Sequence, residues 1–371
     1  MSHFKNKIKL IIITPSLKIG GSQRVIMYLC KYLDAKKFDI TLLIINNQNK
    51  CSSFSVQSLK NIKIIDLKKT HVRNAILNII KVIKVVKPDV VLSTQFHLNA
   101  IMLFVKLFIP SNIKMIARET NIPSMRINGS KLKYIIYRKF YKNFNNVICQ
   151  SNGMKEDLKN VFKIKQDKLV IINNPIDCNA TINKEKSEEN SFYKSDILAI
   201  GSTLGKIKGF ERLIDSIALM NVKNIKLIIL GDGNSKNMLK EKIKNLKLHN
   251  QINLVGLQKD PMKFIQNTNV LAISSYSEGF PNTMLEAGLC GVPTVSFDIK
   301  GGVKDILVDG MNGFLVPDGN LKEFAGSLLK AIDYPFNKMQ IQNHIRNNYN
   351  IEKIIKKYEN LFIDSYNDKG C

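Results

Sequence analysis

The chain has 371 residues, enough for two domains of ordinary size, and 44% of them are hydrophobic, as in a globular protein with a substantial core. No apolar run approaches the ~20 residues that a membrane span needs, and the opening MSHFKNKIKLIIITPS lacks a signal-peptide cleavage pattern, so we expect a cytoplasmic protein. The net charge of +26 favours phosphate-rich partners, meaning nucleic acid, anionic lipid or a charged substrate, and drift in composition is the alternative explanation.

The residue types that hold metal ions occur without the spacings that metal sites use. The six cysteines include no CxxC, so they are interpreted as free thiols rather than a disulfide framework or a zinc site. The five histidines form no HxH or HExxH pair, and no DxD offers paired carboxylates. We therefore expect no metal ion and no other cofactor.

The first half of the chain alternates strand-like apolar runs with helical patterns. Continuous apolar strands that alternate with helices predict a parallel sheet covered on both faces. In 72–87 the apolar residues share one helix face, and Lys81, Lys84 and Lys87 share another. The strand-like runs are 8–14, 38–45, 62–67, 89–94, 113–118, 146–151 and 168–173.

A polar stretch without periodicity, 177–195, predicts a linker, and the alternation then restarts. We expect an N-terminal Rossmann-like domain over 1–176 and a second over 196–350, with the C-terminal segment 351–371 packing back on the first. In two facing domains of this kind, a ligand belongs in the cleft at the carboxyl ends of the strands. The strand-like runs of the second half are 196–202, 225–233, 252–257, 270–275 and 293–297.

Two glycine-containing turns follow predicted strands. Gly20 and Gly21 precede a helix that begins at about Ser22, where unpaired N–H groups can bind an anion. Gly231 and Gly233 form a GxG just past a strand, without the full GxGxxG fingerprint. A plain strand-to-helix turn is the alternative interpretation of each.

Lys206 and Lys208 lie where a loop becomes a helix, near Gly209. A lysine at a helix N-terminus opposes the helix dipole, so this placement favours an anion between the two. An exposed lysine in a lysine-rich chain is the alternative.

The stretch 277–293, SEGFPNTMLEAGLCGVP, places two acids around a turn. Glu278 is on the loop, and Glu286 is on the first turn of a helix that begins at about Asn282, where it is expected to be largely a surface residue. The helix start can bind phosphate or sugar oxygens, and a carboxylate can accept two vicinal hydroxyls of a ribose. The alternative is a pair of ordinary solvated acids. The loop and helix start supply Gly279, Phe280, Pro281, Asn282 and Thr283 as candidate donor-binding residues.

These residues resemble the signature of the retaining glycosyltransferases of family 4, in which seven residues separate two glutamates. The resemblance implies the two-domain GT-B fold and covers nearly the whole chain. It also implies transfer from a nucleotide-diphosphate sugar, with a uridine diphosphate sugar as the expected donor, without a metal ion. The other matching segments are 20–25, 147–158, 172–177, 230–234, 256–271 and 301–320.

The resemblance assigns roles to individual residues. Glu286 would bind the donor ribose and Glu278 would lie near the donor sugar. Lys208 would contact the diphosphate, the loop at Leu257 would hold the base, and the loop of Gly20 and Gly21 would close over the phosphates.

The chain departs from the family pattern at two places. Ser202 stands where the family has an arginine on the diphosphate, and Lys206 is the candidate substitute, although an ammonium is not a bidentate fork. Many relatives have histidines at the positions of Leu92 and Thr94, so His97 remains as the candidate contact to the reacting sugar.

The segment 131–146, KLKYIIYRKFYKNFNN, mixes basic and aromatic residues without an acid. This pattern is typical of a membrane-surface helix with its aromatic side in the headgroups, and it also fits a nucleic-acid-binding surface or a helix with a buried face. An acceptor carried on a lipid diphosphate favours the membrane and a peripheral location, so no nucleic acid partner is expected. The candidate acceptor or membrane contacts are Arg118, Lys133, Arg138, Lys139 and Lys142.

A sugar epimerase of the same fold is the rival enzyme, and it requires acid and base residues beside the sugar, which the sequence does not reveal. The basic nucleic-acid-binding protein is the rival outside enzymes. The identity of the donor sugar and of the acceptor is not encoded in any motif found here.

Overall fold

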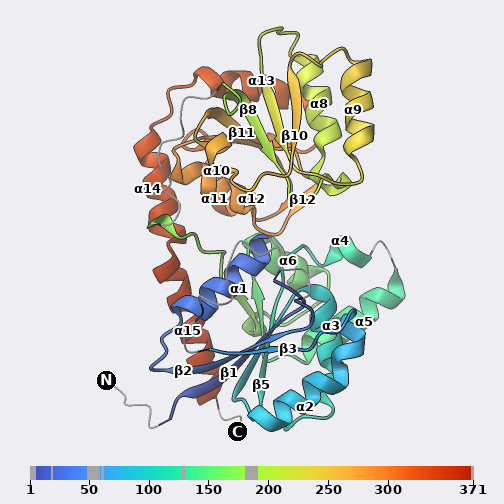
Figure 1. Ribbon diagram of the computed structural model, residues 1–371, viewed down its shortest axis with the longest axis vertical. Coiled ribbons are helices and arrows are strands. Elements are labelled where there is room, and N and C mark those ends of the chain that lie inside the picture. The colour runs from blue at the N-terminus through green and yellow to red at the C-terminus, as the bar shows by residue number, and fades with distance from the viewer. Residues whose placement is uncertain are drawn as a thin grey trace. The chain divides into compact units, whose positions relative to one another are not determined.

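The computed structural model describes residues 6–17, 20–47, 59, 62–127, 130–179 and 191–368, and it contains two compact units (Figure 1). Unit 1 consists of Met1–Pro175 together with Ile351–Cys371, and unit 2 of Ile176–Asn350. Within the predicted linker 177–195, residues 180–190 lie outside the described residues.

Unit 1 is built on a parallel sheet of seven strands in the order β3-β2-β1-β4-β5-β6-β7. The chain places β2 and β3 on one side of β1 and then returns to place β4 on the other, so the strand order reverses between β1 and β4. This is the switch point where open α/β sheets bind ligands. The strands are β1 (Ile8–Thr14), β2 (Phe38–Ile44), β3 (Lys63–Asp66), β4 (Val90–Thr94), β5 (Lys114–Arg118), β6 (Asn146–Cys149) and β7 (Leu169–Ile171).

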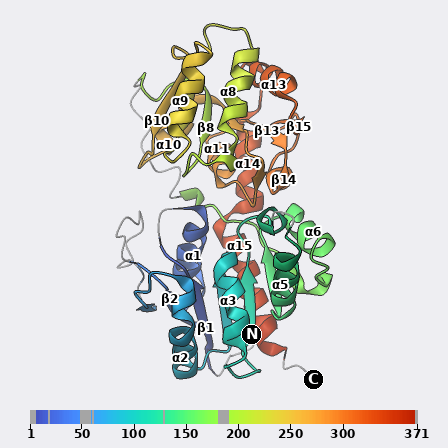
Figure 2. The same ribbon diagram turned by 90° about the vertical axis from the view of Figure 1, so that its right-hand side faces the viewer.

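Helices cover both faces of this sheet, as Figures 1 and 2 show. Successive side chains of β1 point to opposite faces, so Ile11 and Ile13 join one apolar core and Leu10 and Ile12 the other. The first core is completed by α2, α3, α5 and α6, and the second by α1 and α15. The helices are α1 (Gly21–Tyr32), η2 (Val72–Ala75), α2 (Ile76–Val86), α3 (Phe96–Lys106), α4 (Ser124–Ile127), α5 (Lys131–Lys142), α6 (Asn152–Asn160), η3 (Gln166–Lys168) and α15 (Ile351–Asn367).

Although α15 is the last helix of the chain, it belongs to unit 1. Its residues Tyr358 and Phe362 are fully buried, and the ring of Phe362 packs edge-on against Phe38 of β2, with 6.0 Å between centroids. The apolar side of α15 thus completes a core that the first forty residues begin.

Unit 2 has a six-stranded parallel sheet in the order β10-β9-β8-β11-β13-β15, with a separate pair β12-β14. The first five of these strands match predicted strand-like runs, whereas β15, with the residues GFLVP, was predicted only as part of a motif and not as a strand. The strands are β8 (Ser195–Ile200), β9 (Leu227–Leu230), β10 (Ile252–Gly256), β11 (Thr268–Ile273), β12 (Ser277–Glu278), β13 (Thr294–Asp298), β14 (Lys300–Gly301) and β15 (Gly313–Pro317).

The helices of unit 2 pack in two groups, since α8 contacts α9 and α13 while α11 contacts α10 and α14. A Cβ at Gly288 of α11 would lie 2.5 Å from Cγ1 of Ile345, so the absence of a side chain lets α14 approach closely. The helices are η4 (Lys206–Lys208), α8 (Phe210–Leu219), α9 (Lys236–Asn245), α10 (Met262–Ile265), α11 (Asn282–Leu289), α12 (Val303–Ile306), α13 (Leu321–Asp333) and α14 (Lys338–Tyr349).

Candidate active site

Lys208 and Glu278 meet at the carboxyl end of the unit 2 sheet. The Lys208 ammonium lies 2.7 Å from Oε1 of Glu278, and the hydroxyl of Ser275 donates to the same oxygen over 2.6 Å. Both charged side chains are mostly buried, with 24% and 14% of their surfaces exposed. An ammonium has three donors, so this pair holds a preplaced cation that can still donate to a ligand.

The backbone holds this pair from both sides. The hydroxyl of Ser274 donates to the Lys208 carbonyl over 3.0 Å, and the Tyr276 N–H donates to the Ile207 carbonyl over 2.8 Å. Gly209 connects η4 to α8 with φ +59°, and a Cβ there would lie 2.1 Å from the Ser274 carbonyl oxygen. A glycine is therefore required where these two segments touch.

Glu278 is fixed in the same way by the β12-β14 pair. The Gly302 N–H donates to the Glu278 carbonyl over 3.0 Å. Gly301 has φ +126°, and a Cβ there would lie only 1.6 Å from the same carbonyl oxygen. The Gly-Gly pair after β13 thus places the backbone of Glu278.

Arg212 is a buried cation that the sequence analysis missed. Its guanidinium donates to the carbonyl of Ser274 at 2.5 Å, to the carbonyl of Ser275, and to Oδ1 of Asp318 at 2.7 Å. The rings of Tyr276 and Phe297 each lie 4.1 Å from its Cζ. Arg212 therefore braces the segment that carries Glu278. Its place four residues after Lys208, on the helix that follows, was the only available signal.

Glu286 lies in the middle of α11 and is 6% exposed, so the expectation of a surface acid is wrong. The reason is that α11 is covered by α10 and α14, which leaves little of it at the surface. Burial, with a further contribution from the Glu286 carboxylate, raises the pKa of the neighbouring Cys290 thiol to about 11. Glu286 is thus a buried carboxylate rather than a solvated one.

The start of α11 also differs in detail from the expectation. Asn282 is the first helical residue rather than a cap, and Pro281 occupies the cap position without a side-chain hydrogen bond. The Met284 N–H donates to the Pro281 carbonyl over 3.0 Å. The Met284 N–H is therefore already used within this turn, and Asn282 and Thr283 beside it are partly buried.

The remaining candidate loops of unit 2 lie at the same edge of its sheet. Gly231 and Gly233 follow β9 and pack against the turn after β8, since a Cβ at Gly233 would lie 3.0 Å from the Leu204 nitrogen. Leu257 follows β10 and is 61% exposed. Lys206 begins η4 and is exposed, and no ion pair among the described residues involves it.

In unit 1 the helix α1 begins at Gly21, with extended Gly20 at its cap position. Arg118 lies fully buried near this helix start. Its guanidinium donates to Tyr358 Oη over 2.9 Å, to Asn174 Oδ1 over 2.7 Å and to Ser22 Oγ over 3.5 Å. Such burial excludes Arg118 from contact with a lipid surface, so the prediction that Arg118 contacts the membrane is wrong. Arg118 instead ties α15 to the end of β5.

Helix α5 presents the opposite face from the one expected. Phe140 and Tyr141 are fully buried, and Tyr134 and Tyr137 pack against the same core, with the Phe96 and Tyr137 rings 4.2 Å apart. The exposed side chains are aliphatic and cationic, because the aromatic residues fill the space over the sheet. They are Leu132, Ile135 and Ile136, with Lys131, Lys133, Lys139 and Lys142. Arg138 is half-buried.

His97 lies on the first turn of α3, after β4, with its ring exposed. Partial desolvation and then Arg126 lower the pKa of its imidazole. Among the described residues, no group of three or more His, Cys, Asp or Glu could hold a metal ion. None of the helices in the described part of the chain combines the length and the apolar character that crossing a membrane requires.

Two family models match adjoining parts of the chain. The model described as "Glycosyltransferase Family 4" matches residues 19–180, and "Glycosyl transferases group 1" matches residues 181–363. Together they leave only the two ends of the chain unmatched.

The chain is also similar to individual proteins and to a solved structure. An uncharacterized glycosyltransferase of Methanocaldococcus jannaschii is 35% identical over 63% of this chain and 61% of its own length. N-acetylgalactosamine-N,N'-diacetylbacillosaminyl-diphospho-undecaprenol 4-alpha-N-acetylgalactosaminyltransferase of Campylobacter jejuni is 29% identical over 84% of this chain and 87% of its own. The crystal structure of Anabaena HepE in complex with UDP-glucose matches with a TM-score of 0.80 at 17% identity, over 96% of this chain and all of that one. The predicted fold class, a GT-B protein of two Rossmann-like units, is confirmed.

Proposed function

We propose a specific reaction for this chain, which belongs to the glycosyltransferases that the two family models describe and is therefore a transferase. It moves a sugar from a uridine diphosphate sugar to a hydroxyl of a lipid-linked or polysaccharide acceptor in glycan biosynthesis, with retention of configuration. The UDP-glucose complex of HepE supports the donor, and the name of the Campylobacter relative supports an acceptor on a lipid diphosphate.

The observation that carries the proposal is the Lys208–Glu278 pair with Ser275 beside it. In the proposed complex, Lys208 donates to the diphosphate while it keeps its bond to Glu278, and Glu278 lies near the donor sugar. Arg212 and Gly209 hold this arrangement in place before the donor arrives. Preorganised charge of this kind needs no rearrangement when negative charge develops on the leaving group.

The nucleoside end of the donor is assigned to the neighbouring elements. The buried Glu286 carboxylate accepts the two ribose hydroxyls, and the exposed loop at Leu257 holds the base. The turn at Gly231 and Gly233 and the helix start at Asn282 and Thr283 line the same edge of the sheet. Desolvation of Glu286 strengthens any hydrogen bond that it accepts.

The proposed chemistry uses no metal ion and no other cofactor. As the sugar–oxygen bond to the diphosphate breaks, the sugar becomes oxocarbenium-like and negative charge grows on the diphosphate. Lys208, with Lys206 as a second cation, stabilises that charge. The acceptor hydroxyl attacks from the face that the diphosphate leaves, which retains the configuration, and a diphosphate oxygen takes the hydroxyl proton.

A donor screen tests the proposal. The purified chain is incubated with uridine, guanosine and adenosine diphosphate sugars and a lipid-diphosphate acceptor extract, and release of the nucleotide diphosphate is measured. We expect release from one or more uridine diphosphate sugars, with a matching loss in the Lys208→Ala variant. Release from another nucleotide alone would overturn the donor assignment. Conversion of the donor into an epimeric nucleotide sugar, without nucleotide release, would favour the epimerase.

We further propose that the chain binds anionic membranes through the outer face of α5. The aliphatic residues Leu132, Ile135 and Ile136 are 68%, 60% and 46% exposed, and their i, i+3, i+4 spacing puts them together on one face of the helix. The exposed lysines of the same helix are suited to lipid phosphates. The partner is a bilayer surface, since the acceptor is proposed to be anchored there, and no nucleic acid is required.

A further inference from the structure

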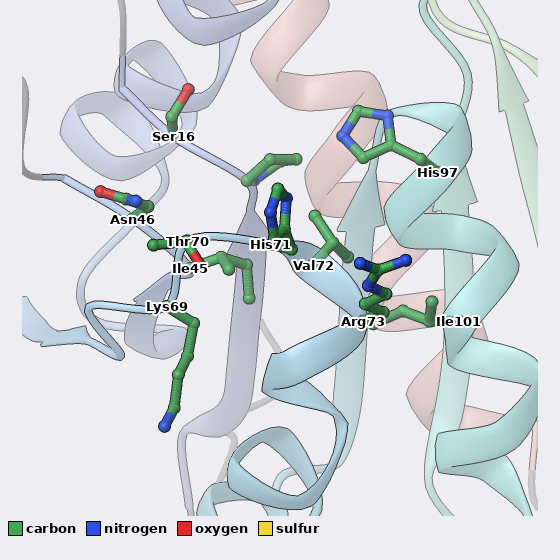
Figure 3. Close-up of a pocket in the computed structure, with 11 residues that line it drawn as sticks. Ser16, Ile45, Asn46, Lys69, Thr70, His71, Val72, Arg73, His97 and Ile101 are labelled. Atoms are coloured by element: carbon green, nitrogen blue, oxygen red, sulfur yellow. The ribbon is translucent and has the colours of Figure 1, made fainter.

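Unit 1 contains a cavity of about 580 Å³ at the carboxyl end of its sheet (Figure 3). Its wall comes from the segments after β1, β2 and β3 and from the start of α3, which follows β4. This is the point where the strand order of unit 1 reverses, so the topology alone marks it as a ligand site.

Among the described residues, the lining includes the cations Lys69 and Arg73 and no acid. Figure 3 shows the Lys69 side chain running away from the side chains of His71, Arg73 and His97. His71 and Arg73 are exposed, and no ion pair among the described residues involves Arg73 or Lys69. A guanidinium and two imidazoles in one lining, with no carboxylate among its described residues, are suited to an anionic oxygen group.

The rest of the lining is suited to a sugar. Ser16, Asn46 and Thr70 offer polar groups for hydroxyls, while Ile45, Val72 and Ile101 give an apolar wall for the face of a ring. The two kinds of surface lie within a volume that holds one or two sugar residues. The cavity therefore combines hydroxyl recognition with a fixed positive charge.

We propose that this cavity binds the acceptor through a negatively charged group, a phosphate or a carboxylate, which Arg73 and His71 contact while His97 and Ser16 face the acceptor hydroxyls. The proposal rests on the glycosyl transfer proposed above, because that reaction requires an acceptor. It narrows the acceptor to anionic glycans and assigns recognition of their charged group to Arg73 and His71.

The binding test uses the full chain and three small probes. Glycerol 1-phosphate supplies a phosphate, glucuronic acid a carboxylate, and glucose neither. The imidazole proton signals of His71 and His97, assigned with the His71→Gln and His97→Gln variants, are followed by NMR during titration. We expect both signals to shift with at least one anionic probe at a concentration about tenfold or more below that needed for glucose. The more effective probe identifies the charged group.

Two variants then distinguish binding of the anionic probe in this cavity from nonspecific attraction of an anion to a positively charged protein. Arg73→Gln should weaken the anionic probe about tenfold, as the loss of one charge-assisted hydrogen bond does, and leave glucose unchanged. Lys159→Gln, which removes one exposed charge from α6 on the same unit, is the matched control and should have no effect. Equal binding of glucose, or equal effects of the two variants, would overturn the proposal, as would the absence of any shift.

Failure of this proposal is distinguishable from failure of the proposed function. UDP binding and the slow release of UDP from the donor without an acceptor depend on unit 2 in our scheme, so Arg73→Gln should retain both. If the wild-type chain releases no nucleotide from any sugar, the proposed function fails whatever the probes show. If nucleotide release is normal and neutral acceptors work as well as anionic ones, only the anionic acceptor is wrong.

Discussion

At the scale of single residues, the Lys208–Glu278 pair is the most informative feature of unit 2. Lys208→Ala should lower turnover by about 10²-fold or more, the effect of removing one preorganised electrostatic contact. Lys206 is exposed and lies at the start of the same turn, so Lys206→Ala reports whether it replaces the arginine that Ser202 displaces. Initial rates of nucleotide release measure both. If Lys208→Ala were as active as the wild type, the assignment of this turn to the diphosphate would be wrong.

Glu286 calls for a conservative change because it is buried. Alanine would leave a cavity and confuse binding with folding, whereas glutamine keeps the volume and one acceptor oxygen. Glu286→Gln should weaken UDP binding by about tenfold or more, since a charged acceptor of ribose hydroxyls becomes a neutral one. Isothermal titration with UDP measures this, and uracil, which lacks ribose, should bind both proteins alike. Unchanged affinity for UDP would exclude the ribose role.

Glu119 lies fully buried beside Arg118, and it gives the chain a pH-dependent stability. Burial, opposed by a 2.7 Å hydrogen bond from Asn99, raises the pKa of its carboxyl from 4.5 to about 7. The folded state then holds this proton to higher pH than the unfolded state does. The stabilisation is complete below pH 4.5 and is lost as the pH rises through 7, on the order of 3 kcal/mol in total.

Glu119→Gln removes that titration and keeps the shape. Relative to the wild type, the variant should gain on the order of 3 kcal/mol of unfolding free energy between pH 4.5 and pH 8. Urea unfolding of both proteins at several pH values gives the difference, and subtraction cancels the carboxylates that they share. A constant difference across this range would show that Glu119 ionises normally in the folded chain.

At the scale of elements, the sequence predicted strands better than it predicted exposure. Each apolar run of the first half forms a strand, because continuous Ile, Leu and Val in short segments have few other structures available. The β15 strand was missed because GFLVP is flanked by glycine and proline and lies inside a motif. The Glu278 loop and the helix with Glu286 were found, but Arg212 was not, since a buried arginine has no sequence pattern of its own.

Helix α5 shows why the helical spacing of apolar residues does not by itself predict which of them face the core. Its aromatic and aliphatic residues are both apolar, so the amphipathic pattern cannot tell which of them faces the core. Phe140 and Tyr141 face the core: their rings pack against each other, and the Tyr141 ring also packs against Phe162, which leaves the aliphatic residues outside. In the proposed membrane contact of this helix, Leu132, Ile135 and Ile136 therefore make the apolar contact with the bilayer.

This orientation gives a sharp test of the membrane proposal. Changing Leu132, Ile135 and Ile136 together to Gln should abolish sedimentation with phosphatidylglycerol vesicles, because it removes the apolar contact. Changing Lys131, Lys133, Lys139 and Lys142 to Gln should weaken binding by up to about 1 kcal/mol per charge and remove its salt dependence.

The matched control is the change of Lys223, Lys240, Lys244 and Lys247 of unit 2 to Gln, which removes the same number of exposed charges from elsewhere in the chain. If that control weakened vesicle binding as much as the α5 lysine variant, attraction would come from total charge. If the aliphatic variant bound normally, α5 would not be the anchor. Tighter binding to RNA than to vesicles at physiological salt would instead favour a nucleic-acid partner.

At the scale of the whole molecule, chain order and spatial order differ. The last helix, α15, completes the core that β1 and β2 begin, and its Tyr358 hydroxyl accepts from buried Arg118. Unit 2, by contrast, is one uninterrupted segment with a core of its own. Each unit therefore has the apolar core that a separately folding domain needs.

Two separate cores predict two unfolding transitions. A ligand and a mutation can show which transition belongs to which unit. UDP is proposed to bind unit 2, so it should raise the midpoint of one transition by mass action. Phe362→Ala removes a fully buried ring from unit 1 and should cost about 3–5 kcal/mol there, lowering the midpoint of the other transition. Differential scanning calorimetry measures both shifts, with Phe297→Ala as the matched buried-ring variant in unit 2. If Phe362→Ala and UDP moved the same transition, the two cores would unfold as one cooperative unit. Separate shifts would show that each unit unfolds on its own, as two separate cores require.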